Sequence, residues 1–103
     1  MPIREQLELK IRELPGLVPG PSRYGHGSAY RAGGREVAHF HGDSRMDIRI
    51  TRDVIRDRSA EGGFDARVRT RGDSSEWVEV RFSSSRDFPL VLSLLEEAMR
   101  ANE

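Results

Sequence analysis

Two of the three histidines in this sequence, His39 and His41, are separated by a single residue in the stretch EVAHFHGD. Alternate side chains of a β-strand point to the same side, so both imidazoles are expected to face one surface. Neutral imidazole is a good ligand for zinc and other borderline metals, and imidazole also titrates near neutral pH. The pair therefore predicts one of two kinds of chemistry, metal binding or general acid–base catalysis.

A metal site needs more ligands than this pair. If the Gly-Gly turn at residues 33–34 forms the tip of a hairpin, the preceding strand brings a third histidine opposite His41. The candidate metal ligands are His26, His39 and His41, with oxygen from Asp43, Asp47 or Glu79. The alternative is that these histidines are solvated or hydrogen-bonded strand residues, because no cysteine and no His-Glu-x-x-His motif accompanies them.

Arginine and tryptophan side chains are expected on the same surface, from neighbouring strands. Guanidinium groups bind carboxylate or phosphate through paired hydrogen bonds, and an indole ring stacks on flat organic groups. The predicted ligand-binding residues are His39, His41, Asp47, Arg49 and Trp77. The alternative is cross-strand pairing of arginine with acidic residues, in which each exposed pair contributes well under about 1 kcal/mol.

Hydrophobic periodicity indicates the elements that position these residues. Helical spacing over residues 3–14 and 88–99 predicts a helix at each end of the chain. The stretch PGLVPGP, residues 15–21, contains too many prolines and glycines for regular structure, so we expect an ordered loop there. A hairpin is expected over residues 26–41, a strand over 46–51, a short helix capped by Thr51, and a second hairpin from residues 64–70 and 76–82.

This order of elements predicts an α+β fold, with a single antiparallel sheet of about five strands and the N- and C-terminal helices packed on one face. The apolar side of the strands carries Ile48, Ile50, Ala66, Val68, Val78, Val80 and Phe82. The open side carries Asp47, Arg49, Arg67, Arg69, Trp77, Glu79 and Arg81, together with the histidines. A two-residue turn at 33–34 would place Tyr30 opposite Val37 and Ser28 opposite His39.

Length and composition narrow the possible functions. The 103 residues suit one domain over residues 1–103. Seventeen basic residues, all arginine except Lys10, balance seventeen acidic ones, and this zero net charge argues against a dedicated nucleic-acid binder. The lack of cysteine excludes thiolate metal sites and suits the cytoplasm. No stretch approaches the roughly 20 apolar residues that span a bilayer, so we expect no membrane partner.

The stretches AYRAGGREVAHFHGDSRMDIRIT and SEWVEVRF, followed by an apolar helix, resemble the luciferase-domain family of small bacterial and fungal proteins, whose function is uncharacterised. That family typically shows a GGxE(I/V)xHxHG segment, a DxR(I/L) strand and a Trp-Val strand. The resemblance spans about residues 14–100, and its best motif is Glu36 with His39, His41 and Gly42. It implies that His39, His41, Asp47, Arg49 and Trp77 belong together on the open face. Members often carry another histidine before the Trp strand, where this chain has Arg67, Arg69 and Arg71.

The leading functional hypothesis is a non-enzymatic module that binds a small anionic ligand or a protein partner on the open face. One alternative is an enzyme that uses His39 and His41 as acid–base residues or metal ligands. Another is a homodimerisation module in which Trp77 is covered by a second copy of the chain. The sequence identifies no cofactor and no substrate, because flavin and nucleotide-binding motifs are missing from it.

Overall fold

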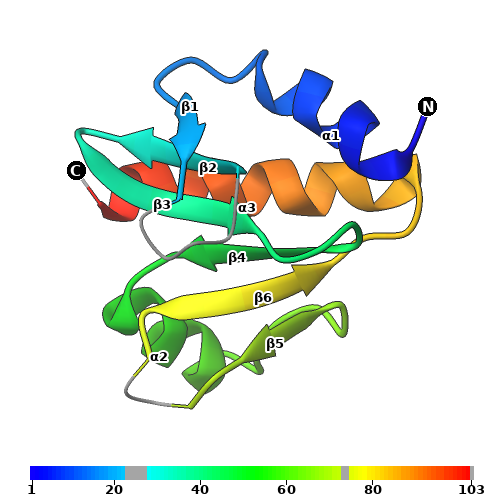
Figure 1. Ribbon diagram of the computed structural model, residues 1–103. Coiled ribbons are helices and arrows are strands. Elements are labelled where there is room, and N and C mark those ends of the chain that lie inside the picture. The colour runs from blue at the N-terminus through cyan, green and yellow to red at the C-terminus, as the bar shows by residue number, and fades with distance from the viewer. Residues whose placement is uncertain (23–27, 73–74, 103) are drawn as a thin grey trace.

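The computed structural model describes residues 1–22, 28–72 and 75–102. Its α-helices are α1 (Ile3–Ile11), α2 (Arg52–Ala60) and α3 (Phe88–Ala101), and a short 3-10 turn, η1 (Ser85–Asp87), leads into α3. Its strands are β1 (Val18–Pro21), β2 (Ser28–Ala32), β3 (Arg35–Phe40), β4 (Arg45–Arg49), β5 (Val68–Thr70) and β6 (Trp77–Arg81). The strands form one antiparallel sheet in the order β1-β2-β3-β4-β6-β5 (Figure 1).

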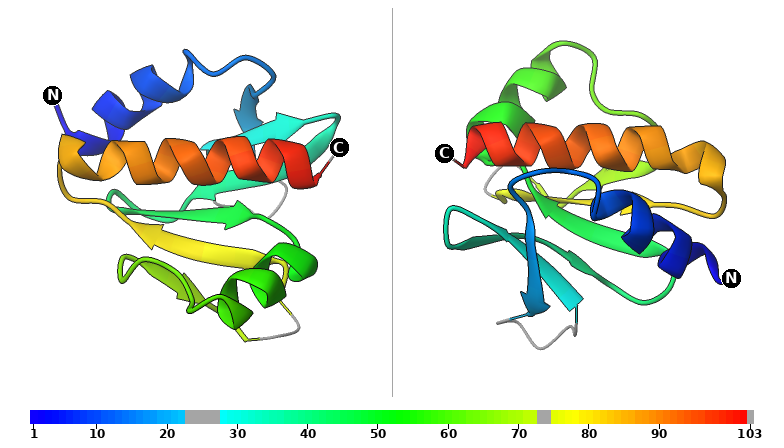
Figure 2. Two further views of the ribbon diagram at one scale, coloured as in Figure 1. Left: turned by 180° about the vertical axis from the view of Figure 1, so that it is seen from behind. Right: turned by 90° about the horizontal axis from the view of Figure 1, so that it is seen from above.

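The helices cover one face of this sheet. Figure 2 shows α1 and α3 crossing the same face, and α2 joins α3 through the ion pair between Arg58 and Glu97. Apolar side chains of the strands alternate toward these helices, as the period of two predicts. The largest fully buried side chains include Phe40, Phe82, Leu7, Ile11 and Met46. The predicted α+β fold, with its terminal helices on one face of an antiparallel sheet, is confirmed.

The sheet has six strands rather than about five, because part of the proline-rich stretch forms β1. Residues Val18–Pro21 pair antiparallel with β2, with Pro19 opposite Tyr30 and Pro21 opposite Ser28. Proline lacks a backbone N–H, but an edge strand needs hydrogen bonds on one side only, so it tolerates proline. The expectation of a loop over the whole of residues 15–21 was therefore wrong at this strand.

The first hairpin forms around Gly33 and Gly34, both of which have positive φ angles as its two-residue turn requires. The predicted register holds beside the turn but shifts between Tyr30 and Arg31, where a β-bulge makes Val37 an extra residue. Consequently Tyr30 lies opposite Ala38, and Ala29 lies opposite His39. The predicted pairs Tyr30–Val37 and Ser28–His39 were wrong, because a one-residue shift reverses the face of each side chain beyond it.

Two other local expectations are corrected. Thr51 directly precedes α2 as predicted, but its side chain makes no capping hydrogen bond and its φ is 76°, unlike the extended conformation of an ordinary N-cap. Strand β5 covers only Val68–Thr70, and Ala66 is exposed instead of lying in the core. The reason is a turn in which Asp65 accepts hydrogen bonds from the backbone and side chain of Arg67.

The C-terminal helix α3 has 14 residues, and its buried face is Phe88, Val91, Leu94, Leu95 and Ala98. Asp87 organises the entry to this helix. Its Oδ2 accepts the backbone N–H of Ser83 at 2.8 Å and that of Ser84 at 3.3 Å, and its Oδ1 accepts from Arg67 at 2.7 Å.

Among the described residues, no helix combines the length and apolar character needed to cross a membrane.

We expect Asp87→Ala to lower the free energy of unfolding by about 1 to 2 kcal/mol at pH 7, because it removes the hydrogen bonds that cap η1, the turn that leads into α3. The hydrogen bonds from Ser83 and Arg67 lower the pKa of Asp87 to about 2. A carboxyl whose pKa is lower in the folded state stabilises the fold above its unfolded pKa of about 4, and this contribution disappears as the pH falls toward 2. The difference between wild type and variant should shrink over that interval.

Urea denaturation of both proteins at a series of pH values measures this difference. The matched control is Asp53→Ala in the first turn of α2, where the Asp53 side chain is 80% exposed and pairs only with Arg56 among the contacts described. We expect this control to change the free energy of unfolding by less than about 0.5 kcal/mol. Equal effects of the two variants at pH 7 would contradict the capping role of Asp87.

Candidate functional site

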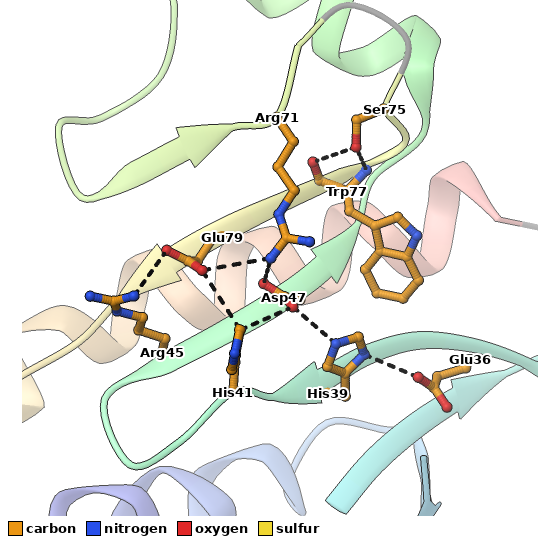
Figure 3. Close-up of polar contacts among 9 residues, drawn as sticks. All are labelled: Glu36, His39, His41, Arg45, Asp47, Arg71, Ser75, Trp77 and Glu79. Atoms are coloured by element: carbon orange, nitrogen blue, oxygen red, sulfur yellow. Dashed lines mark hydrogen bonds and ion pairs between the residues drawn. The ribbon is translucent and has the colours of Figure 1, made fainter. Parts of the chain in front are cut away.

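The side chain of His39 lies at the centre of a buried polar cluster, on the face of the sheet opposite the helices (Figure 3). Its Nδ1 is 3.0 Å from Glu36 Oε2, and its Nε2 is 2.9 Å from Asp47 Oδ2. His39 is 5% exposed, Glu36 4% and Asp47 2%. The centre of the predicted open face is therefore buried and not exposed to solvent. Both ring nitrogens of His39 face carboxylates, so His39 positions Glu36 and Asp47.

Both ring nitrogens of His39 lie within hydrogen-bond distance of a carboxylate oxygen. Which nitrogen donates depends on the tautomer of the ring, because a neutral imidazole carries one N–H. Ser22 adds a further hydrogen bond to Glu36 Oε2 at 3.0 Å.

Asp47 connects this buried group to side chains that reach the surface. Strand pairing places Asp47 opposite His39 on β3 and opposite Glu79 on β6. Asp47 Oδ1 accepts a hydrogen bond from Arg71 at 3.0 Å, and Asp47 Oδ2 lies 3.7 Å from His41 Nδ1. Glu79 Oε2 lies 3.8 Å from the same His41 nitrogen and 3.6 Å from Arg71. Figure 3 shows the four side chains converging on one point.

The charge of Asp47 depends on these contacts. Burial alone would raise the pKa of its carboxyl, but the hydrogen bond from His39 and the charges of Arg71, His39 and His41 outweigh burial. Together they lower the pKa of Asp47 below its ordinary value. The site therefore holds a buried carboxylate anion with its positive partners arranged around it.

Basic side chains surround the two acids at the surface. The side chains of His41, Arg45 and Arg71 are 47%, 50% and 46% exposed. Arg69 lies directly opposite Glu79 and Arg81 directly opposite Arg45, and both are exposed. We call these five residues the cationic face: His41, Arg45, Arg69, Arg71 and Arg81. Like charges directly opposite each other on a sheet repel, so the Arg45–Arg81 pair carries an electrostatic cost.

Two of the sequence-predicted site residues, Trp77 and Arg49, lie at the edge of this arrangement. The Trp77 ring is half-buried and packs against His39, with ring centroids 5.1 Å apart. Arg49 lies opposite Trp77, but its guanidinium contacts Glu76 at 2.9 Å and the side chain of Asn102 at the end of α3. Arg49 thus joins the sheet to α3, while Trp77 covers the buried histidine.

Three of the candidate metal ligands that the sequence suggests, His41, Asp47 and Glu79, lie close together in the described part of the chain. Atoms of His41, Asp47 and Glu79 that can bind a metal lie within 4.8 Å of one another. His39 instead hydrogen-bonds to Glu36 and Asp47 through its two ring nitrogens. His26 lies outside the described residues.

Glu36, Arg45 and Arg71 are site residues that the sequence interpretation did not select from strand spacing. Arg45 carried a usable signal, because it precedes Asp47 and Arg49 at a spacing of two and so faces the same side. Glu36 is three residues before His39, and in a regular strand the two would face opposite sides. The bulge at Val37 adds the residue that brings Glu36 to the side of His39.

The residues of this site lie within the part of the chain that matches a known family model. A family model described as "Luciferase domain" matches residues 34–98, which include Glu36, His39, His41, Asp47, Arg71 and Glu79. Searches of the curated proteins and of the solved structures each found no significant match. The family model covers more than half of the chain, from the first hairpin to α3. The chain belongs to the luciferase-domain family.

Proposed function

We propose that this domain binds a small anionic molecule, carrying a carboxylate or phosphate group, on the cationic face. The observation that carries the proposal is the arrangement of His41, Arg45 and Arg71. Each side chain is about half exposed, and each contacts a buried carboxylate of Asp47 or Glu79 on its inner side. Buried carboxylates of this kind hold cationic groups in place while the rest of each group faces outward.

Such an arrangement favours anions for two physical reasons. Holding a long arginine side chain in place before binding reduces the conformational entropy lost when a ligand arrives. The cationic face also contains four guanidinium groups against two carboxylates, so its local charge is positive although the net charge of the chain is zero. An anion between Arg45 and Arg81 would relieve their mutual repulsion.

The chemistry of the face defines the class of ligand. A guanidinium group donates two parallel hydrogen bonds to a carboxylate or phosphate, and charge-assisted hydrogen bonds are stronger than neutral ones. Arg71 and Arg45 lie on opposite sides of Glu79 in Figure 3. A ligand with two or more anionic oxygens could therefore contact both arginines, and binding should weaken as added salt screens the charges.

Isothermal titration calorimetry with inorganic phosphate and with citrate, at low ionic strength, tests the proposal. We expect Arg45→Gln and Arg71→Gln each to weaken binding about tenfold, which corresponds to the loss of one charge-assisted hydrogen bond of about 1.5 kcal/mol. The matched control is Arg56→Gln on α2, whose side chain is 70% exposed and distant in sequence from the face. This control should bind both anions as the wild type does.

Two outcomes would contradict the proposal. One is that neither phosphate nor citrate produces a heat of binding at low ionic strength. The other is that the Arg45 and Arg71 variants bind as tightly as the control. Native mass spectrometry of the same samples gives the number of subunits, and a dimer that Trp77→Asp converts to a monomer would favour self-association as the role of this face.

A further inference from the structure

Three side chains of the site direct metal-binding atoms toward a common point. These atoms are His41 Nδ1, Asp47 Oδ2 and Glu79 Oε2. The histidine nitrogen is 3.7 Å from the Asp47 oxygen and 3.8 Å from the Glu79 oxygen. Asp47 and Glu79 are 2% and 8% exposed, so the two carboxylates are not a cluster of solvated surface acids.

The spacing and chemistry of these atoms suit a divalent transition metal. Zinc bonds to histidine nitrogen and carboxylate oxygen are about 2.0 to 2.2 Å long, so the ligand atoms of a tetrahedral site lie about 3.4 Å apart. The separations of His41 Nδ1 from the two carboxylate oxygens exceed this value by only a few tenths of an ångström. One imidazole and two carboxylates form a donor set for zinc or a similar borderline ion, and three protein ligands leave one position open.

Neighbouring residues already orient the ligands in the manner of an outer coordination shell. His39 Nε2 contacts Asp47 Oδ2 at 2.9 Å, and Arg71 donates to Asp47 Oδ1 at 3.0 Å. Glu36 in turn fixes the His39 ring through a contact of 3.0 Å. Metal-binding carboxylates are usually held by such partners, which keep their oxygens aimed at the ion.

We propose that His41, Asp47 and Glu79 form a site for one divalent transition metal ion, with Zn²⁺ as the best match to the donor set. The ion's charge balances the two carboxylates, which releases Arg71 and Arg45 to hold an anion at the open coordination position. The metal site stands on its own geometry, whereas this bridge between metal and anion rests on the function proposed above. Arg71, which is 46% exposed, can move outward as the ion enters.

The role of Arg71 separates this site from incidental binding by a surface histidine. Arg71 now lies 3.0 Å from Asp47 and 3.6 Å from Glu79, so its positive charge competes with a metal ion for the same two carboxylates. Removing this charge should therefore strengthen metal binding, even though the same change weakens binding of an anion to the metal-free protein. An incidental site at an exposed imidazole would not respond to Arg71 in this way.

Titration of the metal-free protein with Zn²⁺ alone, followed by calorimetry and native mass spectrometry, tests the proposal. We expect one bound ion per chain, a loss of at least a hundredfold in affinity in His41→Ala and Glu79→Gln, and a gain of several-fold in Arg71→Ala. The matched control is Asp43→Ala, an acidic neighbour that is 97% exposed, and it should bind Zn²⁺ like the wild type.

Retention of wild-type Zn²⁺ affinity in both His41→Ala and Glu79→Gln would overturn the proposal, and so would the absence of any bound ion. The phosphate titration of the metal-free protein is independent of this result. Zn²⁺ binding without phosphate binding would uphold the metal site and reject the anion function. Phosphate binding without Zn²⁺ binding would do the reverse.

Discussion

Replacing His39 with alanine is expected to lower the free energy of unfolding by about 3 kcal/mol, because it leaves two buried carboxylates without their shared partner. The imidazole separates Glu36 from Asp47 and contacts both at hydrogen-bond distance. In its absence the two acids face each other across an emptied space. Asp47 retains Arg71, and Glu36 retains Ser22, so the loss is large but need not abolish folding.

Urea denaturation measures this effect, and His41→Ala is the matched control. His41 is the same residue type two positions along the chain, but its side chain is 47% exposed, and its described contacts with Asp47 and Glu79 are at 3.7 and 3.8 Å. We expect the His41 variant to lose less than about 1 kcal/mol. If the two alanine variants were equally stable, the buried Glu36–His39–Asp47 group would not have the structural role described here.

Replacing Phe40 with alanine should have an even larger effect on stability, about 4 kcal/mol, because it empties the middle of the core. Phe40 is completely buried, and its ring meets Tyr30 and Phe82 edge to face at centroid distances of 6.1 and 6.0 Å. The guanidinium of Arg4 on α1 also lies over the ring, 4.4 Å from its centroid. The change would therefore weaken the attachment of α1 as well as the sheet.

The control for Phe40→Ala is Phe64→Ala, because Phe64 is half-buried at the margin of the core beside Arg58. Thermal and urea denaturation should show a loss of about 1 to 2 kcal/mol for this control. Phe40 and the cationic face lie on opposite sides of the sheet, so phosphate affinity of the folded Phe40 variant should equal that of the wild type. A loss of affinity without unfolding would show that the two faces are coupled.

The sequence predicted which face each strand residue occupies wherever the strands are regular. Met46, Ile48 and Val78 alternate with Asp47 and Glu79, and this period of two placed the apolar set in the core and the acids on the other side. The Gly-Gly turn likewise predicted the first hairpin. These signals are local, and local conformational preferences are what a single sequence displays most directly.

The contacts within the site could not be predicted in the same way, because they depend on register and on distant residues. The bulge at Val37 is a one-residue irregularity without a sequence signal, yet it decides that Glu36 meets His39. Arg71 reaches Asp47 across 24 residues of chain, and only the strand order β4-β6-β5 brings them together. Burial of the acids also depends on these neighbours, which is why an open, solvated face was expected.

Net charge was a poor guide to the surface for a related reason. Equal numbers of acidic and basic residues argued against a dedicated nucleic-acid binder but did not show where the charges lie. The fold places two acids beneath the sheet surface and leaves four arginines above them. Because the acids are buried and the arginines are exposed, the charge on the outer surface of this face is positive. The local field of the cationic face, rather than the charge of the whole chain, is what a small ligand meets.

A two-dimensional ¹H–¹⁵N NMR titration of the metal-free protein with inorganic phosphate tests directly whether an anion binds on the cationic face. We expect the largest shifts at the side-chain Nε–H signals of Arg45 and Arg71 and at the backbone amides around His41. Shifts concentrated instead in the groove between α1 and β1, lined by Arg12 and Tyr30, would contradict binding on this face. So would a spectrum that phosphate leaves unchanged at low ionic strength.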